Sequence, residues 1–317
     1  MSHLKESESK VSKIFKYLLK NYLPNSKDNI KQIFLKLLFL LSVTGVIVSS
    51  VVIGGYLTET QKQKNIIEES RQIWYSKEIS STVDTNDENY AVKQELLKEN
   101  KDFIGWIRIN NTKIDNPVYK TDNNDYYLTH NQCGEESRYG AIFAHSENII
   151  RKDKTDKNIV LFGHNMKDGM MFGDLKNLRN INFYKQNPTI EFTSLYRNTE
   201  TYKIYAVFVL NAVRQDDGGH MYDIYKNKFS SENNFNFWYE EALDRSFIKT
   251  TVDVNKEDEF LTLVTCCNDF KNARLVVMAR KTRENEGTLV DTENATLNKN
   301  VKYPKAWYKK RGLSYPF

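Results

Sequence analysis

The sequence predicts a mainly β fold, a closed barrel or a β-sandwich, with few helices. Seven apolar, β-branched runs are separated by turn-rich segments, and seven or eight short strands of this kind are typical of barrels and sandwiches. The longest run, 202–212, alternates two sets of side chains, as expected for a strand that is buried on one face and partly covered on the other. One set is Tyr202, Ile204, Ala206, Phe208 and Leu210, and the other is Lys203, Tyr205, Val207 and Val209. The seven runs are 103–109, 140–145, 158–164, 189–194, 202–212, 259–266 and 274–280.

Two helices are expected inside this β-rich body. Residues 90–99 have helical spacing, and the stretch before the last two strands, 230–247, places Phe235, Trp238, Ala242 and Leu243 on one helical stripe. The second helix is therefore expected to cover one face of the strands.

The composition excludes several classes of site. The 317 residues include three cysteines and five scattered histidines, with no C-x-x-C pair. A disulfide framework needs more cysteines, and a zinc site needs clustered thiolates or imidazoles. There is also no glycine-rich phosphate loop, no repeat and no nucleic-acid motif. We therefore expect no metal, no cofactor and no nucleic-acid partner.

Residues 37–57 predict a membrane anchor. This stretch holds 21 residues without a charge, or about 31 Å of helix, which matches the hydrocarbon thickness of a bilayer. The alternatives are a buried core helix or a cleaved signal peptide, but a signal peptide has a shorter apolar core and a cleavage site. Residues 1–36 carry eight lysines against three acidic residues, which predicts a cytoplasmic N-terminus and an outward-facing body.

The remaining segments predict five regions in all. A basic cytoplasmic N-terminus (1–36) and the anchor (37–57) precede a juxtamembrane helix and polar linker (58–89). The folded domain follows over 90–281, although the helix after the anchor could belong to it. A polar extension, 282–317, ends in an aromatic and basic tail that could contact a wall or membrane, or pack against the barrel.

Two adjacent cysteines, Cys266 and Cys267, stand where the predicted strand 259–266 ends. Neighbouring side chains of a strand point to opposite faces, so Cys266 and Cys267 cannot both face one pocket. A buried free cysteine usually packs as a small apolar side chain. A thiol at a strand end, however, is accessible for chemistry.

An arginine and a histidine accompany these thiols. The short return from Cys266 to Arg274 predicts a hairpin that brings a guanidinium beside the thiol, where it would favour the thiolate or donate hydrogen bonds to an oxyanion. His164 also ends a strand-like run, and an imidazole beside a thiol can take up and return its proton. Spacing alone does not show that the three residues meet.

Five sequence motifs, which follow one another along the chain in the order that the family has, resemble those of class B sortases, the membrane-anchored cysteine transpeptidases of Gram-positive bacteria. The resemblance covers about residues 100–280. "TLVTC" is similar to the T-L-x-T-C signature, "FGHNMKDGMMFGDL" to the histidine segment and "ARLVVMAR" to the arginine strand. "NKDFIGWIRINNTKIDNPV" and "YYLTHN…YGAIF" also match. The resemblance implies an eight-stranded sortase-type barrel with N-terminal helices and a helix before the penultimate strand.

The resemblance also implies roles for individual residues. Cys266 matches the nucleophile, His164 the acid/base and Arg274 the arginine that binds oxyanion and substrate. Asp269 and Thr265 are possible supporting residues, and whether Asp269 supports His164 or Arg274 is open. The variable position of the signature is Val264, where several class B members have a serine. His145 is a rival base that no motif supports.

The implied reaction is cleavage of a C-terminal sorting motif of the N-P-x-T-x type after its threonine, followed by transfer to an amine. The expected partners are secreted proteins with such a signal, a peptidoglycan precursor that supplies the amine, and the membrane. The expected location is the cell membrane, single-pass, with an extracellular catalytic domain. The alternatives are a pilin polymerase that uses a pilin lysine, a cysteine peptidase that gives the acyl group to water, and a non-catalytic tethered binding protein.

Overall fold

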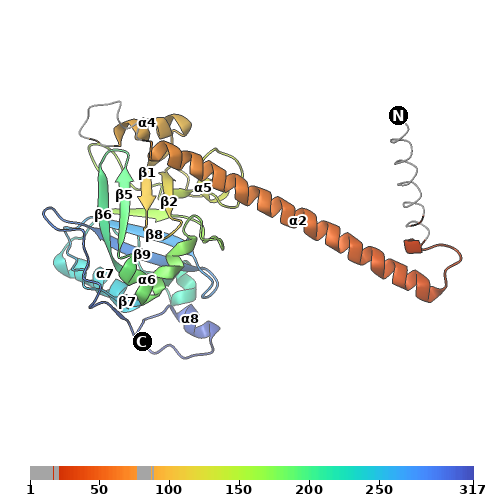
Figure 1. Cartoon of the computed structure of the whole chain (residues 1–317). Coiled ribbons are helices and arrows are strands. Elements are labelled where there is room, and N and C mark those ends of the chain that lie inside the picture. The colour runs from red at the N-terminus through yellow and green to blue at the C-terminus, as the bar shows by residue number, and fades with distance from the viewer. Residues whose placement is uncertain (1–16, 18–20, 77–86, 88) are drawn as a thin grey trace. The chain divides into compact units, whose positions relative to one another are not determined.

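A computed structural model describes residue 17, residues 21–76, residue 87 and residues 89–317 (Figure 1). The chain divides between Lys62 and Gln63 into two compact units, and each is described by itself. Much of the basic N-terminus, including His3, and most of the expected linker lie outside the described residues.

Helix α2 (Ile30–Trp74) contains the apolar segment expected to be an anchor. At its start, Asn29 Oδ1 accepts a hydrogen bond from Gln32 N, and Gln32 Oε1 accepts one from Asn29 N, both at 2.9 Å. This reciprocal pair is a capping box, which satisfies amide groups that a helix start leaves free. The apolar part of α2 is long enough to cross a membrane and is not covered by protein. The orientation of this helix stays a prediction.

The second unit begins with the last turns of α2, earlier than Tyr90. Ile67 and Trp74 are buried there, and the Trp74 ring stacks on Trp106 at 4.9 Å between centroids. Helix α4 (Tyr90–Glu99) follows as the spacing predicts, burying Val92 and Leu96. Both helical segments cover one side of the barrel.

Eight strands close into a barrel, which confirms the predicted fold class. Their order around the barrel is β1-β2-β3-β4-β8-β9-β6-β5. The strands are β1 (Phe103–Arg108), β2 (Asp115–Tyr119), β3 (Ile142–Ala144), β4 (Asn158–Phe162), β5 (Thr189–Ser194), β6 (Thr199–Asn211), β8 (Phe260–Cys266) and β9 (Ala273–Lys281). Two pairs are parallel, β2 with β3 and β4 with β8, and the other neighbours are antiparallel.

The register of β6 corrects the alternation expected from the sequence. A bulge between Ile204 and Ala206 shifts the pairing with β9, so the side-chain pattern changes face at that point. Tyr202 and Ile204 therefore share the barrel interior with Val207 and Val209 rather than with Phe208 and Leu210. Both faces of the strand are buried, because a helix covers the outer one.

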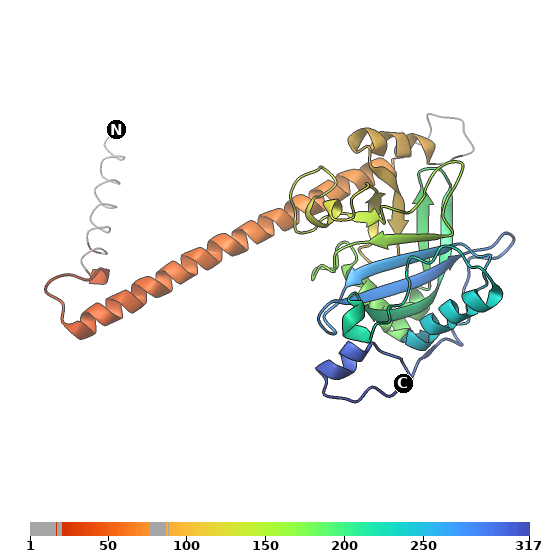
Figure 2. The same ribbon diagram turned by 180° about the vertical axis from the view of Figure 1, so that it is seen from behind.

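Helix α7 (Glu232–Arg245) provides that cover. Phe235, Trp238 and Ala242 are buried on the predicted stripe, and Leu243 is partly buried. The helix starts where Ser231 Oγ accepts a hydrogen bond from Asn234 N. Figure 2 shows α7 in cyan beside the wall that contains β8 and β9 in blue.

The C-terminal extension packs against the barrel. Strand β10 (Thr296–Leu297) pairs with β7 (Ile248–Lys249), and helix α8 (Lys305–Lys310) follows. Tyr303 and Trp307 pack on the main core cluster, the group of buried apolar side chains that includes Ile204, Val207, Leu263 and Val277. Of the two expectations for the aromatic tail, the structure shows packing.

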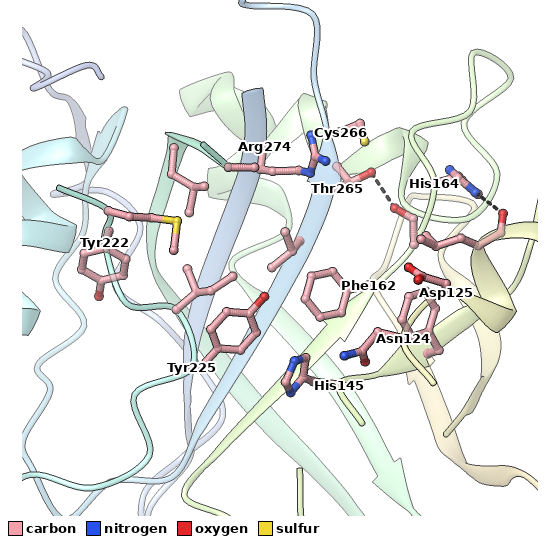
Figure 3. Close-up of a pocket in the computed structure, with 18 residues that line it drawn as sticks. Asn124, Asp125, His145, Phe162, His164, Tyr222, Tyr225, Thr265, Cys266 and Arg274 are labelled. Atoms are coloured by element: carbon pink, nitrogen blue, oxygen red, sulfur yellow. Dashed lines mark hydrogen bonds between the residues drawn. The ribbon is translucent and has the colours of Figure 1, made fainter. Parts of the chain in front are cut away.

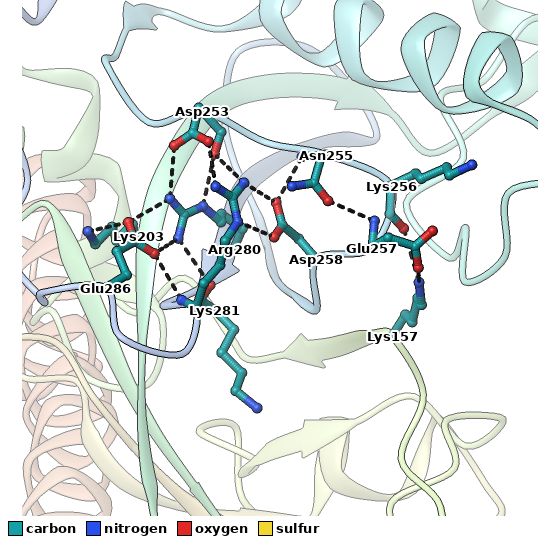
Figure 4. A network of polar contacts seen from close by, with 11 residues as sticks. Lys157, Lys203, Asp253, Asn255, Lys256, Glu257, Asp258, Arg280, Lys281 and Glu286 are labelled. Carbon is teal, nitrogen blue, oxygen red and sulfur yellow. Dashed lines mark hydrogen bonds and ion pairs between the residues drawn. The ribbon is translucent and has the colours of Figure 1, made fainter.

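An ion-pair network closes the end of β9 that lies away from Cys266. Arg280 has a side chain 1% exposed, and its Nη2 donates to Asp253 Oδ1 at 3.1 Å and to Glu286 Oε1 at 2.8 Å (Figure 4). Hydrogen bonds from Arg280 hold the pKa of Glu286 well below its usual range against the opposing effect of burial. Arg280 pairs with Phe260 in the ladder, about 20 Å along β8 from Cys266.

We expect Arg280→Ala to lower the free energy of unfolding by about 2–3 kcal/mol, measured by urea denaturation. This is below the ~3–5 kcal/mol for breaking a fully buried pair, because the exposed Asp253 regains water. Because the pKa of Glu286 is lower in the folded state than in the unfolded chain, this carboxylate stabilises the fold at pH values above its unfolded pKa of about 4.3. That stabilisation is lost as the pH falls from the unfolded pKa through the folded one. Glu286→Gln should therefore flatten the loss of stability below pH ~4. The control Lys256→Ala, in an exposed pair with Glu232, should change stability by less than about 0.5 kcal/mol. Equal losses of unfolding free energy in Arg280→Ala and Lys256→Ala would contradict the prediction.

Candidate active site

One pocket of about 410 Å³ opens where β4, β6 and β8 end and β9 begins (Figure 3). Cys266, His164, Arg274 and Thr265 all line it, and Figure 3 shows them along one side. The rest of the lining is mainly apolar or aromatic. The apolar and aromatic residues of the lining are Leu128, Phe143, Phe162, Leu210, Ala212, Met221, Tyr222, Ile224, Tyr225 and Val264.

The order of the strands brings the three predicted residues together. β4, β8 and β9 are consecutive neighbours in the barrel. Cys266 is paired directly with Arg274 across the β8–β9 ladder, as the short return predicts. In the parallel β4–β8 pair Phe162 lies opposite Val264, and continuing this offset places His164 opposite Cys266. Neighbouring strands lie about 4.8 Å apart, so all three side chains start from adjacent positions.

The imidazole of His164 is oriented by a backbone carbonyl. Its Nε2 lies 2.7 Å from the carbonyl oxygen of Leu128, in the short helix α5 (Tyr126–Thr129). Because a carbonyl only accepts, Nε2 carries a proton, and Nδ1 is the free basic nitrogen of the neutral ring. Gly140, at φ +56°, leaves room for this arrangement, since a Cβ there would lie 2.2 Å from the Tyr127 oxygen and 3.2 Å from His164 Cδ2.

Thr265 joins the strand of the cysteine to the segment of the histidine. Its side chain is buried, and its Oγ1 donates to the carbonyl oxygen of Gly163 at 2.7 Å. Gly163 immediately precedes His164. The hydroxyl therefore fixes the spacing between the two segments at the point where the ladder ends.

The two adjacent thiols have different environments. Cys266 is exposed at the pocket, whereas Cys267 packs against the main core cluster. Burial, with the nearby Asp269 carboxylate, raises the pKa of Cys267 to about 12. Cys267 is therefore a protonated thiol at neutral pH, and Cys266 is the accessible one.

Asp269 does not line the pocket. Its carboxylate accepts two hydrogen bonds from Arg179, at 3.1 and 2.8 Å. Burial opposes its ionisation, but these bonds and the charge of Arg179 hold the pKa of Asp269 below its ordinary value. Arg179 ends η1 (Gly173–Arg179), which follows the His164 segment. The structure thus pairs Asp269 with Arg179 rather than with His164 or Arg274.

Arg274 points its guanidinium along the pocket side that holds Cys266 and Thr265 (Figure 3). Its Nη1 donates to the carbonyl oxygen of Ala273 at 3.1 Å. Burial raises the pKa of Tyr225, and the negative charge of Asp223 raises it further. The positive charge of Arg274 lowers this pKa and so partly offsets both effects. Because the guanidinium lines the pocket, it can act on negative charge that develops there.

His145, the rival base, lies in the same pocket but is displaced along the strands from the position of His164. Its backbone N–H bonds to the carbonyl oxygen of Val160, four residues before His164 on the neighbouring strand. That separation is about 13 Å along the strand. Its ring packs on Tyr225 at 4.5 Å, and burial lowers the pKa of His145. This strand geometry favours His164 as the partner of Cys266.

The segments that carry these residues also match a known protein family. A profile described as the sortase domain matches residues 107–282, which include His164, Cys266 and Arg274. The chain belongs to the sortase family. Sortase B of Listeria monocytogenes is 32% identical over 232 residues, covering 72% of this chain and 88% of the relative. In the part of this sortase that the structure describes, no group of three or more His, Cys, Asp or Glu residues could hold a metal ion.

Solved sortase B structures share the barrel of this sortase. Sortase B of B. anthracis superposes with a TM-score of 0.60 at 26% identity, covering 71% of this chain and 98% of that one. Sortase B of Clostridium perfringens gives 0.53 at 35% identity, covering 60% and 100%. These relatives make the chain a class B sortase, as the motifs predict, and confirm the sortase-type barrel.

Sequence reasoning missed several parts of this sortase's pocket. The carbonyl of Leu128 carries no side-chain signal, because any residue supplies one. Ile224 and Tyr225 come from the turn-rich loop between β6 and α7, where apolar residues have no period. Arg179 follows the histidine segment closely, but nothing in the sequence indicates its pairing with Asp269.

Proposed function

We propose that this class B sortase cleaves a C-terminal sorting motif of the N-P-x-T-x type after its threonine and transfers the protein to a peptidoglycan amine. The observation that supports this most is the position of Cys266, His164 and Arg274 at the same end of three consecutive strands, along one pocket. A thiol can form the thioester, an imidazole can move the protons, and a guanidinium can stabilise the oxyanion, which are three roles that acyl transfer through a thioester needs.

In the first half-reaction His164 Nδ1 takes the proton of the Cys266 thiol, and the resulting thiolate attacks the threonine carbonyl carbon and forms a C–S bond. The carbonyl oxygen becomes an oxyanion, which the Arg274 guanidinium stabilises by hydrogen bonds and charge. The C–N bond then breaks as His164 gives a proton to the leaving amine. Nδ1 is the nitrogen for this proton, because Nε2–H is held by Leu128.

In the second half-reaction an amine attacks the thioester carbon. His164 takes a proton from the amine, the C–S bond breaks, and Cys266 leaves as a thiolate. Amines attack thioesters readily and the product amide is stable, so the transfer needs no oxidant and no cofactor. Thr265 and Asp269 support the reaction indirectly, Thr265 by spacing the two strands and Asp269 through Arg179.

The membrane helix completes the proposal. With the lysine-rich N-terminus in the cytoplasm, residues 37–57 would anchor the catalytic domain, residues 90–281, on the outer face of the cell membrane as a single-pass protein. Secreted substrate proteins and the wall precursor would meet the enzyme at the same surface. Tethering raises their effective concentration at the pocket.

The test uses the full-length chain in detergent micelles with a panel of sorting-motif peptides. We expect mass spectrometry to show a thioacyl adduct on Cys266 and, after addition of glycine or diaminopimelate peptides, an amide product. Hydrolysis alone would indicate a cysteine peptidase, and transfer only to a pilin lysine a polymerase. If none of the peptides formed an adduct on Cys266, the proposal would be contradicted, and the result would favour a non-catalytic binding protein.

A further inference from the structure

The C-terminal extension contacts the loop that joins the two strands of the site. This loop, residues 267–273, includes the first residue of β9, connects Cys266 to Arg274 and sets their relative position. Lys310 Nζ, at the end of α8, donates to the carbonyl oxygen of Asn268 at 3.1 Å. Trp307 of the same helix and Cys267 of the loop both pack on the main core cluster.

A continuous stack of side chains links the extension to the carboxylate of this loop. The Arg179 guanidinium, which binds Asp269 bidentately, lies 4.9 Å from the Phe247 ring centroid. Phe247 is 5.8 Å from Tyr303, and Tyr303 stacks on Trp307 at 4.1 Å.

Arg311 covers the outer end of this stack, with its guanidinium carbon 3.9 Å from the Trp307 ring centroid. Bidentate arginine–carboxylate pairs and stacked guanidinium groups fix geometry as well as energy. The extension therefore holds Arg179, which in turn holds the loop.

The same helix is tied to a second wall of the pocket. The backbone N–H of Lys305 donates to Asp217 Oδ1, in η2 (Arg214–Asp217). The loop that continues from η2 supplies Met221 and Tyr222 to the pocket. One short helix, α8, thus contacts both the loop 267–273 and the segment after β6.

We propose that residues 303–311 are a brace that holds the loop 267–273, and through it Cys266 and Arg274, in the position that the reaction needs. Trp307 and Lys310 are positioning residues of this brace. The proposal rests on the proposed transpeptidase function for its effect on rate, but its structural part does not depend on that function.

The experiment compares Trp307→Ala and Lys310→Ala with Lys309→Ala in the full-length chain in detergent micelles. Lys309 is the matched control, because it is an exposed lysine next to Lys310 on the same short helix, with the same charge. Hydrogen exchange is followed at residues 267–273, where Cys267 N–H and Ala273 N–H make backbone hydrogen bonds.

We expect exchange in this loop to be about tenfold faster in Trp307→Ala and a few-fold faster in Lys310→Ala, with no change in Lys309→Ala or in strand β1. Trp307→Phe, which keeps an aromatic ring against Tyr303 and Arg311, should restore most of the protection. The kcat for peptide transfer should fall by roughly tenfold in Trp307→Ala, less than the ~10²-fold that a 1 Å misplacement can cost.

Wild-type exchange in the loop of Trp307→Ala would overturn the brace. Faster exchange with unchanged kcat would overturn its effect on the reaction. Because exchange is measured without substrate, failure of the brace is distinguishable from failure of the wild-type chain to process any peptide.

Discussion

Replacement of Cys266 by alanine is expected to lower peptide cleavage by at least about 10⁴-fold, as loss of the nucleophile does in other covalent catalysts. Cys267→Ala is expected to keep most of the activity. The physical reason is the change of environment at the strand end. Cys266 is exposed at the pocket, whereas burial and Asp269 raise the pKa of Cys267 to about 12. A thiol that stays protonated is a poor nucleophile.

Initial rates of peptide cleavage with each purified variant measure this difference. Cys133→Ala is the matched control, because Cys133 is also an exposed cysteine and does not line the pocket. Cys267→Ala should reduce stability by about 1 kcal/mol, since it removes a partly buried side chain that packs on the core. Full activity in Cys266→Ala, or its loss in Cys267→Ala alone, would show that the two thiols have the opposite roles.

The part of the site that the sequence predicts directly is local. The return from Cys266 to Arg274 is short, so a hairpin is its simplest geometry, and the ladder pairs these two residues. His164 reaches the same place only through the parallel β4–β8 pair, whose strands are separated by about 100 residues. Spacing does not predict such a pairing, so the resemblance to class B sortases was needed to join His164 to the hairpin.

Two strands show where local patterns fail. The bulge in β6 changes which side chains face the barrel interior, and no single residue type announces it. β2 contains Pro117 beside Asn116 and Asp115, residues that disfavour strands, although Pro117 is paired with Trp106 in the barrel. Tertiary pairing overrides local preference in both strands.

The roles of Asp269 and the C-terminal extension depend on contacts that are remote in sequence. An acidic residue close to the nucleophile suggests a partner within the site, but the carboxylate of Asp269 binds Arg179, and neither residue lines the pocket. The extension is polar and has no periodicity, so its packing cannot be read from its composition. Its contact with Asn268 through Lys310 joins residues 42 positions apart, which local sequence patterns do not connect.

Arg274→Ala is expected to lower kcat/KM for peptide cleavage by about 10²–10³-fold, the cost of removing one oxyanion donor in other acyl-transfer enzymes. The guanidinium lines the pocket on the side of Cys266, from the directly paired position of β9. Arg274→Lys should recover only part of this loss, because an ammonium group is a point charge without the planar pair of N–H donors.

Two rates measured on the same variants separate stabilisation of the oxyanion from activation of the thiol. Acylation by a sorting peptide passes through an oxyanion, whereas alkylation of Cys266 by iodoacetamide does not. If Arg274 acts mainly on the oxyanion, Arg274→Ala should slow acylation by about 10²-fold or more and alkylation by less than about threefold. Lys271→Ala, in the same loop but outside the pocket lining, is the control and should change neither rate. Equal slowing of both reactions in Arg274→Ala would instead assign the guanidinium to the ionisation of Cys266.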